Sequence, residues 1–328
     1  MARRMRALAF EDGAVVVVER PVPQPAADQV LVRVHGAGVN RADLLQRAGL
    51  YPPPPGASDV PGLEFAGVVE ETGPDVQGLG PGDPVFGITA GGGQAEYLLT
   101  VESHCTRVPP SLDLVEAGGV PEAFVTAHDA LFTQAGLHPG NVVLVHAVGS
   151  GVGTAALQLA ACIGASVVGT ARSPGKLERA KTLGLAHAVV APRNLDPGAL
   201  AHAILETAGP VDVVIDLVGG PYLGVDVAVA APKARIVLVG AVAGARSELN
   251  VVEVMAKRLD IRGTVLRSRP AHEKAAATHA FAGHVLPLLA AGSVTPVVEA
   301  VVALEDAAAA YDLLSSDATF GKVVLDCR

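Results

Sequence analysis

The sequence predicts an α/β protein in which a doubly wound parallel sheet is inserted into a β-rich domain. The first reason is the stretch Asn141–Arg172, which contains no Asp, Glu or Lys and whose only Arg is its last residue. It has the order of an apolar strand, a glycine turn, a helix and a second apolar strand. From about residue 123 to residue 262, strand and helix patterns alternate, which is typical of a parallel sheet covered by helices. Residues 1 to about 122 instead carry short apolar runs separated by Pro and Gly.

The first domain is expected to be irregular and rich in β-structure. Its predicted strands are the apolar runs between Pro and Gly clusters, namely Val15–Val18, Gln29–Val34, Ala66–Glu70 and Ala95–Thr100. Tyr51 is followed by four consecutive prolines and Gly56, a sequence that can be neither a helix nor a central strand. We therefore expect a stiff loop there.

A nucleotide-binding unit is predicted from Asn141 onward. Asn141–Ala147 is typical of a strand buried on both faces, and Thr154–Ile163 carries the helix formers Ala, Leu and Gln. Between them lie glycines that let backbone N–H groups approach a pyrophosphate at the positive end of a helix, namely Gly149, Gly151 and Gly153. A P-loop would need Lys and then Ser or Thr after the last glycine, which is followed here by Thr154 and Ala155.

The second strand of this unit, Ser166–Thr170, indicates which cofactor binds. An NAD-binding chain carries an Asp or Glu about 20 residues after the glycines, where it holds the ribose 2′-hydroxyl. Here the strand ends at Thr170 without an acid, and Arg172 follows. A basic side chain suits a 2′-phosphate, so the predicted cofactor is NADPH. The alternative that Arg172 is only a solvated loop charge stays open.

The remaining elements follow in order. The nucleotide domain is completed by a helix that starts at Ser173-Pro174 and ends at Gly184, strand Val211–Leu217, helix Tyr222–Ala230, strand Ala234–Val239, helix Asn250–Arg258 and a strand near Ile261. The tail is predicted as helix His272–Ala291, strand Val297–Leu304, helix Glu305–Ser315 and strand Lys322–Asp326. We expect the tail to return to the first domain, so the domains are 1–122 plus 263–328 and 123–262.

Composition excludes several partners. The net charge is −9 and the basic residues are scattered, which disfavours nucleic acid and anionic membrane surfaces. The uncharged stretch Asn141–Ala171 is long enough for a membrane helix, but its five glycines, His146 and Gln158 argue against one. Three cysteines far apart in the sequence suit a reducing compartment. No targeting segment follows the N-terminal arginines, so a cytoplasmic location is expected.

Several segments resemble the medium-chain dehydrogenases/reductases, and within them the zinc-independent, zeta-crystallin-like quinone oxidoreductases. They are Val39–Asp43, Pro61–Gly67, Pro121–Ala127 and His146–Gly153. Others are closest to the tumour-protein-inducible branch of that group, namely Leu44–Arg47, Tyr51–Ser58 and Leu266–Arg269. The resemblance covers nearly the whole chain. It implies a Rossmann NADPH-binding domain inserted into a GroES-like catalytic domain, hydride transfer at the cleft between them, and a homodimer that pairs along Ile261–Leu266.

The resemblance also implies a set of cofactor contacts. The Ala-x-x-Gly-x-x-Gly turn of the family falls on Ala147, Ser150 and Gly153, with Ser in place of the middle glycine. The contacts expected in the cofactor groove are Thr126, Ala147, Gly149, Ser150, Gly151, Val152, Gly153, Thr170, Arg172, Gly240, Ala241, Val242, Leu266 and Arg267. Lys176 is expected to join Arg172 on the 2′-phosphate, although it could be a solvated helix charge. Val190-Ala191 replaces an Asn-Tyr pair of the family, and Arg193 is a candidate to compensate.

No metal site is predicted. In zinc-bearing relatives a Cys falls at Asn40, a His at Leu63 and a third ligand at about Glu122. Leu63 cannot bind zinc and Asn40 is a poor ligand. The four closely spaced cysteines of the structural zinc lobe are also missing, since only Cys105 lies in that region.

A reaction without metal suits an acceptor that delocalises negative charge, such as a quinone, with hydrogen-bond donors to stabilise it. The candidate donors are the amide of Asn40 and the phenol of Tyr51, and Asp43 is expected to orient their loop. Asn40 could instead be a turn residue, Tyr51 could only stack over the cleft, and water could supply the proton. The predicted function is NADPH:quinone oxidoreductase. The alternatives are an NADPH-dependent enone or enoyl-thioester reductase and a non-catalytic NADPH-binding protein.

Overall fold

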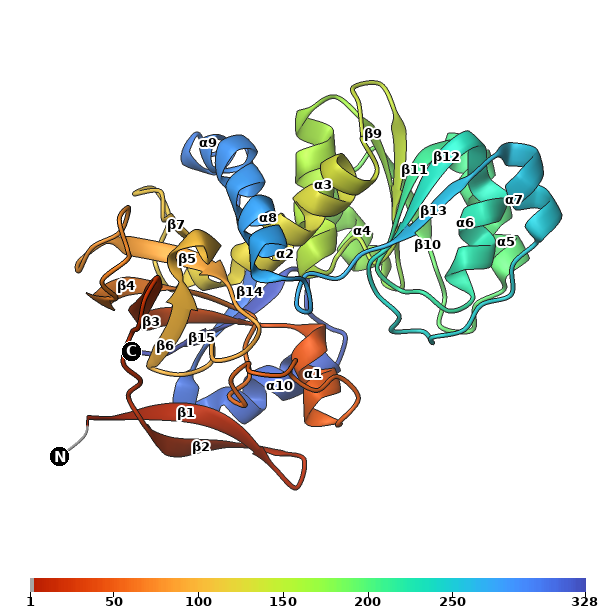
Figure 1. Cartoon of the computed structure of the whole chain (residues 1–328). Helices are drawn as coiled ribbons and strands as arrows, with labels where there is room; N and C mark the ends of the chain where they lie inside the picture. The colour runs from red at the N-terminus through yellow and green to blue at the C-terminus, as the bar shows by residue number, and fades with distance from the viewer. Residues whose placement is uncertain (1–2) are drawn as a thin grey trace. The chain divides into compact units, whose positions relative to one another are not determined.

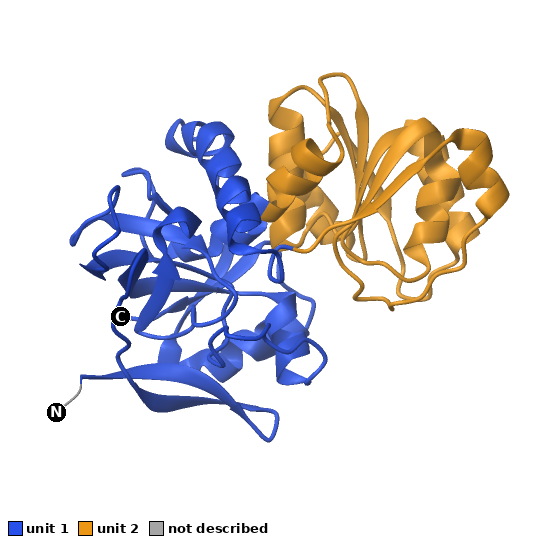
Figure 2. Cartoon of the chain, viewed as in Figure 1, with its two compact units in different colours: residues 1–125, 266–328 blue, residues 126–265 orange. Residues whose placement is uncertain are grey.

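The chain forms two compact units, which Figure 2 colours separately. The computed structural model describes residues 3–328. Unit 1 comprises Met1–Val125 and Leu266–Arg328, and unit 2 comprises Thr126–Val265. Unit 2 is therefore an insertion in the sequence of unit 1. The predicted fold class is confirmed, because unit 2 holds a parallel sheet and unit 1 is mainly antiparallel β-structure.

Unit 2 is a doubly wound sheet with the strand order β10-β9-β8-β11-β12-β13, and every pairing in it is parallel. Figure 1 shows α3 and α4 on one face of the sheet and α5, α6 and α7 on the other. The elements are β8 (Val142–Val145), α3 (Gly151–Cys162), β9 (Ser166–Ala171), α4 (Pro174–Lys181), β10 (His187–Val190), α5 (Pro197–Ala208), β11 (Val211–Asp216), α6 (Tyr222–Val229), β12 (Ala230–Leu238), α7 (Val251–Lys257) and β13 (Asp260–Gly263).

The core of unit 2 explains why its strands are apolar on both faces. Leu144, Val168, Val214 and Ile236 lie on four adjacent strands and are fully buried together with side chains from α5 and α6. Strands covered on both faces need such near-continuous apolar runs. The strand order reverses at β8, and the ends of β8 and β9 there are the usual place for a nucleotide site.

Unit 1 has a sheet with the order β14-β15-β3-β4-β5-β7, and β6 also pairs with β3. A separate hairpin is formed by β1 and β2. The tail returns here as expected, because β15 pairs antiparallel with β3. The elements are β1 (Arg4–Glu11), β2 (Ala14–Pro21), β3 (Gln29–Val39), α1 (Arg41–Arg47), β4 (Glu64–Thr72), β5 (Pro84–Ile88), β6 (Tyr97–Val101), β7 (Cys105–Arg107), α2 (Pro121–His128), which continues into unit 2, α8 (Ala271–His284), α9 (Leu286–Ala290), β14 (Val298–Ala303), α10 (Ala307–Ser315) and β15 (Lys322–Asp326).

Several expectations need correction. The predicted helix His272–Ala291 is two helices, α8 and α9, because Pro287 lacks an N–H to continue the hydrogen-bond ladder and instead lies in the first turn of α9, where no N–H is needed. The short helix α1 was not predicted in the β-rich domain. In unit 2, β10 and α5 were not predicted either. The Tyr51–Gly56 segment forms neither helix nor strand, as expected of a loop. Within residues 3–328, no helix is long and apolar enough to cross a membrane.

Candidate functional site

The glycine turn after β8 is built for close backbone approach. Ser150 is the N-cap of α3, and its hydroxyl oxygen accepts a hydrogen bond from the N–H of Gly153 at 3.1 Å. Ala147 has a positive φ of 51°. A Cβ at Gly153 would lie 2.4 Å from the carbonyl oxygen of Ala147. Gly153 is therefore required sterically, whereas Ser150 replaces a glycine and caps the helix.

The first turn of α3 can receive an anion. Gly151 and Val152 are its first two residues and are partly exposed, and N–H groups at these positions have no partner within a helix. The first turn contains no acidic side chain. The positive end of the helix dipole favours a negative group there. The turn therefore fits a pyrophosphate, with the buried Gly149 directly before the capping serine.

The ends of β8 and β9 are tied together by a buried polar cluster that the sequence analysis missed. Thr170 accepts a backbone bond from Val148 at 3.0 Å, and its hydroxyl lies 2.8 Å from Nδ1 of His146. Nε2 of His146 lies 2.8 Å from Oδ1 of Asp226, and both side chains are fully buried. Burial raises the pKa of Asp226 to about 6 in spite of His146. The edge of the Tyr222 ring packs on His146, with centroids 4.7 Å apart.

The remaining unit 2 candidates lie around the same sheet edge. Arg172 is exposed directly after β9, and Lys176 is partly buried in the first turn of α4. Arg193 is exposed. Burial raises the pKa of Tyr222, and the positive charge of Arg172 opposes that rise. The structure also places Thr126, which is buried, at the start of unit 2, and the loop after β12 contains the half-buried Gly240 and the exposed Ala241 and Val242.

In unit 1, Asn40 and Asp43 form a capping box at the start of α1. The N–H of Asn40 donates to Oδ2 of Asp43 at 2.8 Å. Asp43 is fully buried and also accepts from Nε2 of Gln94 at 3.2 Å. Burial raises the pKa of Asp43 to about 6. Gln94 is held in turn by the hydroxyl of Tyr311, which donates to Oε1 of Gln94 at 2.6 Å, so Asp43 belongs to a buried chain of hydrogen bonds at the start of α1.

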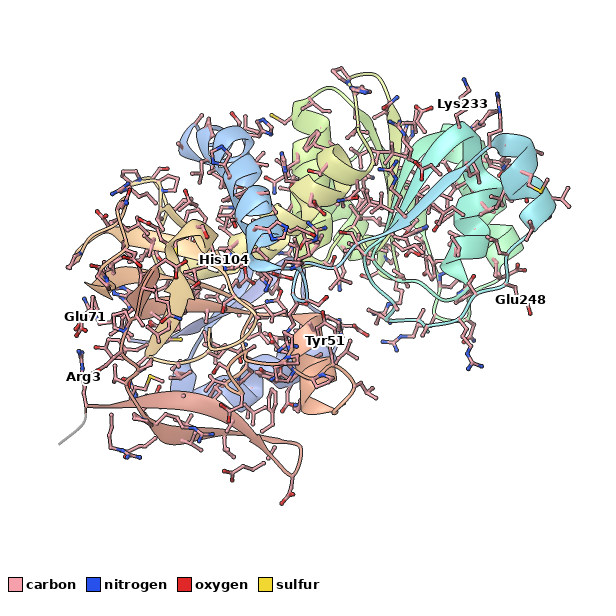
Figure 3. All side chains as sticks on the ribbon, in the orientation of Figure 1. Arg3, Tyr51, Glu71, His104, Lys233 and Glu248 are labelled. Carbon is pink, nitrogen blue, oxygen red and sulfur yellow. The ribbon has the colours of Figure 1, made fainter. Side chains whose placement is uncertain are left out.

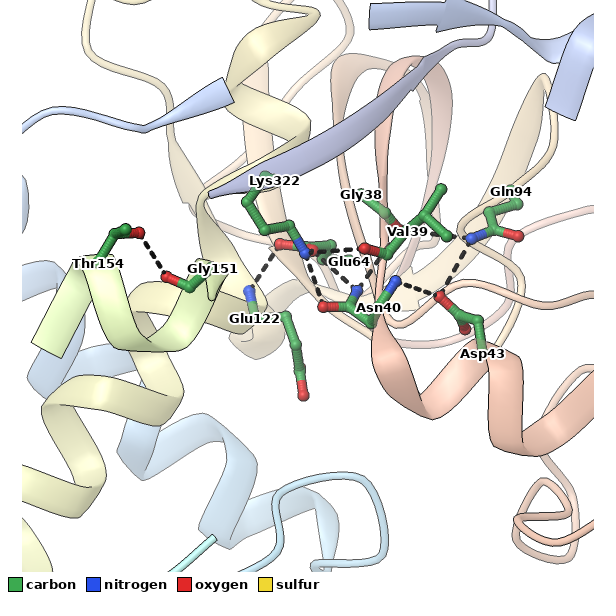
Figure 4. Close-up of polar contacts among 10 residues, drawn as sticks. All are labelled: Gly38, Val39, Asn40, Asp43, Glu64, Gln94, Glu122, Gly151, Thr154 and Lys322. Carbon is green, nitrogen blue, oxygen red and sulfur yellow. Dashed lines mark hydrogen bonds and ion pairs between the residues drawn. The ribbon is translucent and has the colours of Figure 1, made fainter. Parts of the chain in front are cut away.

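The amide of Asn40 takes part in a buried ion-pair network (Figure 4). Nζ of Lys322 lies 2.6 Å from Oε1 of Glu64 and 2.6 Å from Oδ1 of Asn40. Nδ2 of Asn40 donates to Oε1 of Glu64 at 2.9 Å. The other carboxylate oxygen of Glu64 accepts from the N–H of Glu122 at 2.8 Å. Glu64 is 0 % and Lys322 6 % exposed, so the charges compensate each other inside the protein.

Tyr51 is held by Arg267, which comes from the returning tail. Nη1 of Arg267 donates to the carbonyl of Tyr51 at 3.0 Å, and the guanidinium lies 5.0 Å from the centre of the Tyr51 ring. The same guanidinium also donates hydrogen bonds to the carbonyl oxygen of Ala90 and to Oε1 of Gln46, a residue of α1. Tyr51 is half-buried (it is labelled in Figure 3), and its hydroxyl has no hydrogen-bond partner among residues 3–328. Burial raises the pKa of this phenol, so it is a neutral donor at neutral pH.

The positions expected for zinc ligands in relatives are occupied differently. Leu63 is buried, and Asn40 contacts Lys322. Glu122 is partly exposed, and burial together with the negative charge of Glu64 raises its pKa to about 8. Within residues 3–328, no three His, Cys, Asp or Glu side chains are grouped as metal ligands would be. The cation that Glu64 and Asn40 bind is the ammonium group of Lys322.

The structure therefore brings the expected residues together in groups. In unit 2, Ala147, Gly149–Gly153 and Thr170 meet at one edge of the sheet, with Arg172 and Lys176 directly after β9. In unit 1, Asn40 joins Asp43, while Tyr51 joins Arg267, and Leu266 is buried beside it in sequence. The residues missed from the sequence are Glu64, Gln94, Tyr311, Lys322, His146, Asp226 and Tyr222. None of these seven residues has a local sequence signal for its contacts. The Asn40–Asp43 contact does have one, because a spacing of three residues fits a capping box.

Comparisons with known proteins agree with this architecture. Residues 26–133 match the family model described as an alcohol dehydrogenase GroES-like domain, and residues 151–282 match the one described as a zinc-binding dehydrogenase. The rat (Rattus norvegicus) quinone oxidoreductase is 33 % identical, over 98 % of this chain and 97 % of its own. A mycobacterial protein solved in complex with NADPH is 27 % identical, with a TM-score of 0.85 over 98 % of this chain and 99 % of its own. A structure described as an NAD-dependent alcohol dehydrogenase is 30 % identical, with a TM-score of 0.83 over 98 % and 99 % of the two chains.

Proposed function

Because the chain belongs to the zeta-crystallin-like quinone oxidoreductases of the medium-chain dehydrogenase/reductase superfamily, we propose that it is a zinc-free, NADPH-dependent quinone oxidoreductase. The observation that carries the proposal is the ammonium of Lys322, bonded at 2.6 Å to Asn40 and Glu64. The ammonium of Lys322 is bonded to the side chain of Asn40, the residue that stands where zinc-bearing relatives have a Cys ligand. Hydride acceptors that spread negative charge over a conjugated carbonyl system suit such a site.

Unit 2 supplies the groups that hold the cofactor. We expect the N–H groups of Gly151 and Val152 to hold the pyrophosphate of the cofactor, and Arg172 and Lys176 to hold its 2′-phosphate. NADPH supplies a hydride when it is bound. Relatives with either cofactor share this fold, so the preference depends on residues at the end of β9. The missing acid there and the basic pair support NADPH.

Unit 1 supplies the groups that position and protonate the acceptor. Both ends of the Asn40 amide are engaged by Glu64 and Lys322, so we assign Asn40 a positioning role at the start of α1. The hydroxyl of Tyr51 is the candidate donor to the acceptor oxygen. Arg267 holds the Tyr51 backbone and lies against its ring, which fixes the donor at low entropic cost.

Substrate preference tests this proposal. We expect ortho- or para-quinones to be reduced faster than linear enones, since the fixed ring of Tyr51 can stack on a flat acceptor, an interaction of about 0.5–1.5 kcal/mol. Tyr51→Ala should raise KM for the quinone about 2- to 12-fold, the size of that interaction, and Tyr51→Phe should mainly lower kcat. NADPH affinity is the control, because Tyr51 lies outside unit 2. If the parent protein reduces the enone as fast as the quinone or faster, the quinone assignment is wrong and the protein is an enone reductase. If it binds NADPH but reduces neither acceptor, it is a non-catalytic NADPH-binding protein.

Metal removal should leave the enzyme unchanged. Leu63 cannot bind zinc, and Lys322 occupies the oxygen of Asn40, so dialysis against a strong chelator should alter neither kcat nor Tm. The comparison is a sample dialysed against buffer alone. Zinc present in a one-to-one ratio in the purified protein, together with activity lost to the chelator, would contradict the proposal.

A homodimer is proposed at the free edge of the unit 2 sheet. β13 is last in the strand order, and α7 just before it exposes Val251, Val252 and Met255 by 59 %, 75 % and 70 %. An edge strand beside exposed apolar side chains calls for a covering partner. Light scattering at micromolar concentration should give twice the chain mass, and Val252→Glu should shift it toward the monomer. A monomeric parent protein would contradict this interface.

A further inference from the structure

Unit 1 contains a cavity of about 400 Å³ that none of the residues assigned to the reaction lines. Its wall comes from β1, β6, the segments around Ser58 and Gly91, and the start of α8. Much of the lining is apolar, including Met5, Val60 and Leu98. A volume of this size suits a small molecule.

A buried cation lines this cavity. Lys274 on α8 is only 8 % exposed, and among residues 3–328 its ammonium forms no hydrogen bond or ion pair. Burial lowers the pKa of Lys274, the charge of Arg267 lowers it further, and only the charge of Glu122 opposes the shift. Glu122 gives little compensation at neutral pH, because its own pKa is raised to about 8. An anionic ligand in the cavity would therefore give this ammonium a charge-assisted bond that no residue in the described part of the chain supplies.

His104 is the second polar group of the cavity wall (labelled in Figure 3). It is 8 % exposed, and its Nε2 lies 3.0 Å from the carbonyl oxygen of Ala271. Nε2 must donate in this bond, because a carbonyl only accepts. Burial lowers the pKa of His104, and Lys274 lowers it further, so the ring is neutral at neutral pH. Lys274 is therefore the one positive charge among the lining residues.

We propose that this cavity binds a small organic monocarboxylate, whose carboxylate pairs with Lys274 and whose hydrocarbon body lies against Met5, Val60 and Leu98. One lining cation selects one negative charge, and the apolar wall disfavours inorganic anions. The site is independent of the proposed oxidoreductase activity, since Asn40, Asp43 and Tyr51 take no part in it.

Titration calorimetry with octanoate, 1-octanol and inorganic phosphate tests the proposal on the full-length chain. Octanoate should bind the parent protein with one site per chain, at least about tenfold more tightly than 1-octanol, because a charge-assisted bond contributes that factor. Phosphate should not compete. Lys274→Met should weaken octanoate by at least about tenfold without changing the affinity for octanol. Lys233→Met, which removes an exposed lysine of unit 2, is the matched control and should bind octanoate as the parent does.

The fold of the variant is checked separately. Lys274→Met removes an unpaired buried charge, so its Tm without ligand should equal or exceed that of the parent. Lys274→Gln gives the same binding test should the Met variant not fold. Unchanged octanoate affinity in both variants, equal affinity for octanoate and octanol in the parent, or no octanoate binding at millimolar concentration would each overturn the site.

Discussion

Lys322→Met should lower the free energy of unfolding by about 3–5 kcal/mol, the usual cost of removing one partner from a buried ion pair. The ammonium of Lys322 is the only cation bonded to Glu64 among residues 3–328, and Glu64 is fully buried. Without it, the carboxylate stays in the protein interior with only the N–H donors of Asn40 and Glu122. Because Asn40 also loses the donor to its oxygen, kcat should fall together with stability. Urea unfolding and steady-state rates measure the two effects.

Two further variants separate buried charge from lost packing. Lys322→Met combined with Glu64→Gln removes both charges and keeps the shapes, so it should recover most of the lost stability. Lys181→Met breaks the exposed pair with Glu178, whose side chains are 51 % and 69 % exposed, and should cost less than about 1 kcal/mol. A loss below about 1 kcal/mol in Lys322→Met, or no recovery in the double variant, would show that the network is not a compensated ion pair.

The parts of the fold that the sequence predicted are those with local causes. The strand, glycine turn and helix from Val142 to Cys162 follow one another directly, and each carries its own pattern of apolar and glycine residues. β10 was missed because it has four residues and only Val189 is buried. α5 was missed although Asp196 caps it and Pro197 is its first residue, which is an ordinary helix start.

The network of unit 1 could not be predicted in the same way. Glu64 is 24 residues from Asn40 and 258 residues from Lys322, and only the pairing of β15 with β3 brings the lysine back. A lysine in the apolar run of a final strand gives no sign of its partner. The sequence offered the amide of Asn40 as a hydrogen-bond donor to the acceptor. It could not show that the amide nitrogen bonds to Glu64 and the amide oxygen to Lys322. Tyr51 could be proposed from the sequence because the four prolines after it predict a stiff backbone.

Arg172→Ala should weaken NADPH binding by about tenfold or more and leave NADH binding unchanged. A charge-assisted bond to a phosphate contributes about 1.5–3 kcal/mol, and each 1.4 kcal/mol is a factor of ten in affinity. Arg172 is exposed directly after β9, and NADH lacks the 2′-phosphate that it would contact. Lys176→Ala should have a similar but smaller effect, because an ammonium cannot make the paired bonds of a guanidinium.

Fluorescence titration with both cofactors measures these effects, and Lys181→Ala at the end of the same helix, α4, is the control. The loss of NADPH affinity in Arg172→Ala should shrink at high salt, since exposed charges are screened. Equal affinity of the parent for NADH and NADPH would refute the NADPH assignment. So would equal weakening of both cofactors by Arg172→Ala, because the guanidinium would then act on a group that the two share. If Arg172→Ala weakens NADPH binding alone, the preference for NADPH depends on Arg172, which follows β9 where NAD-binding chains carry an acid.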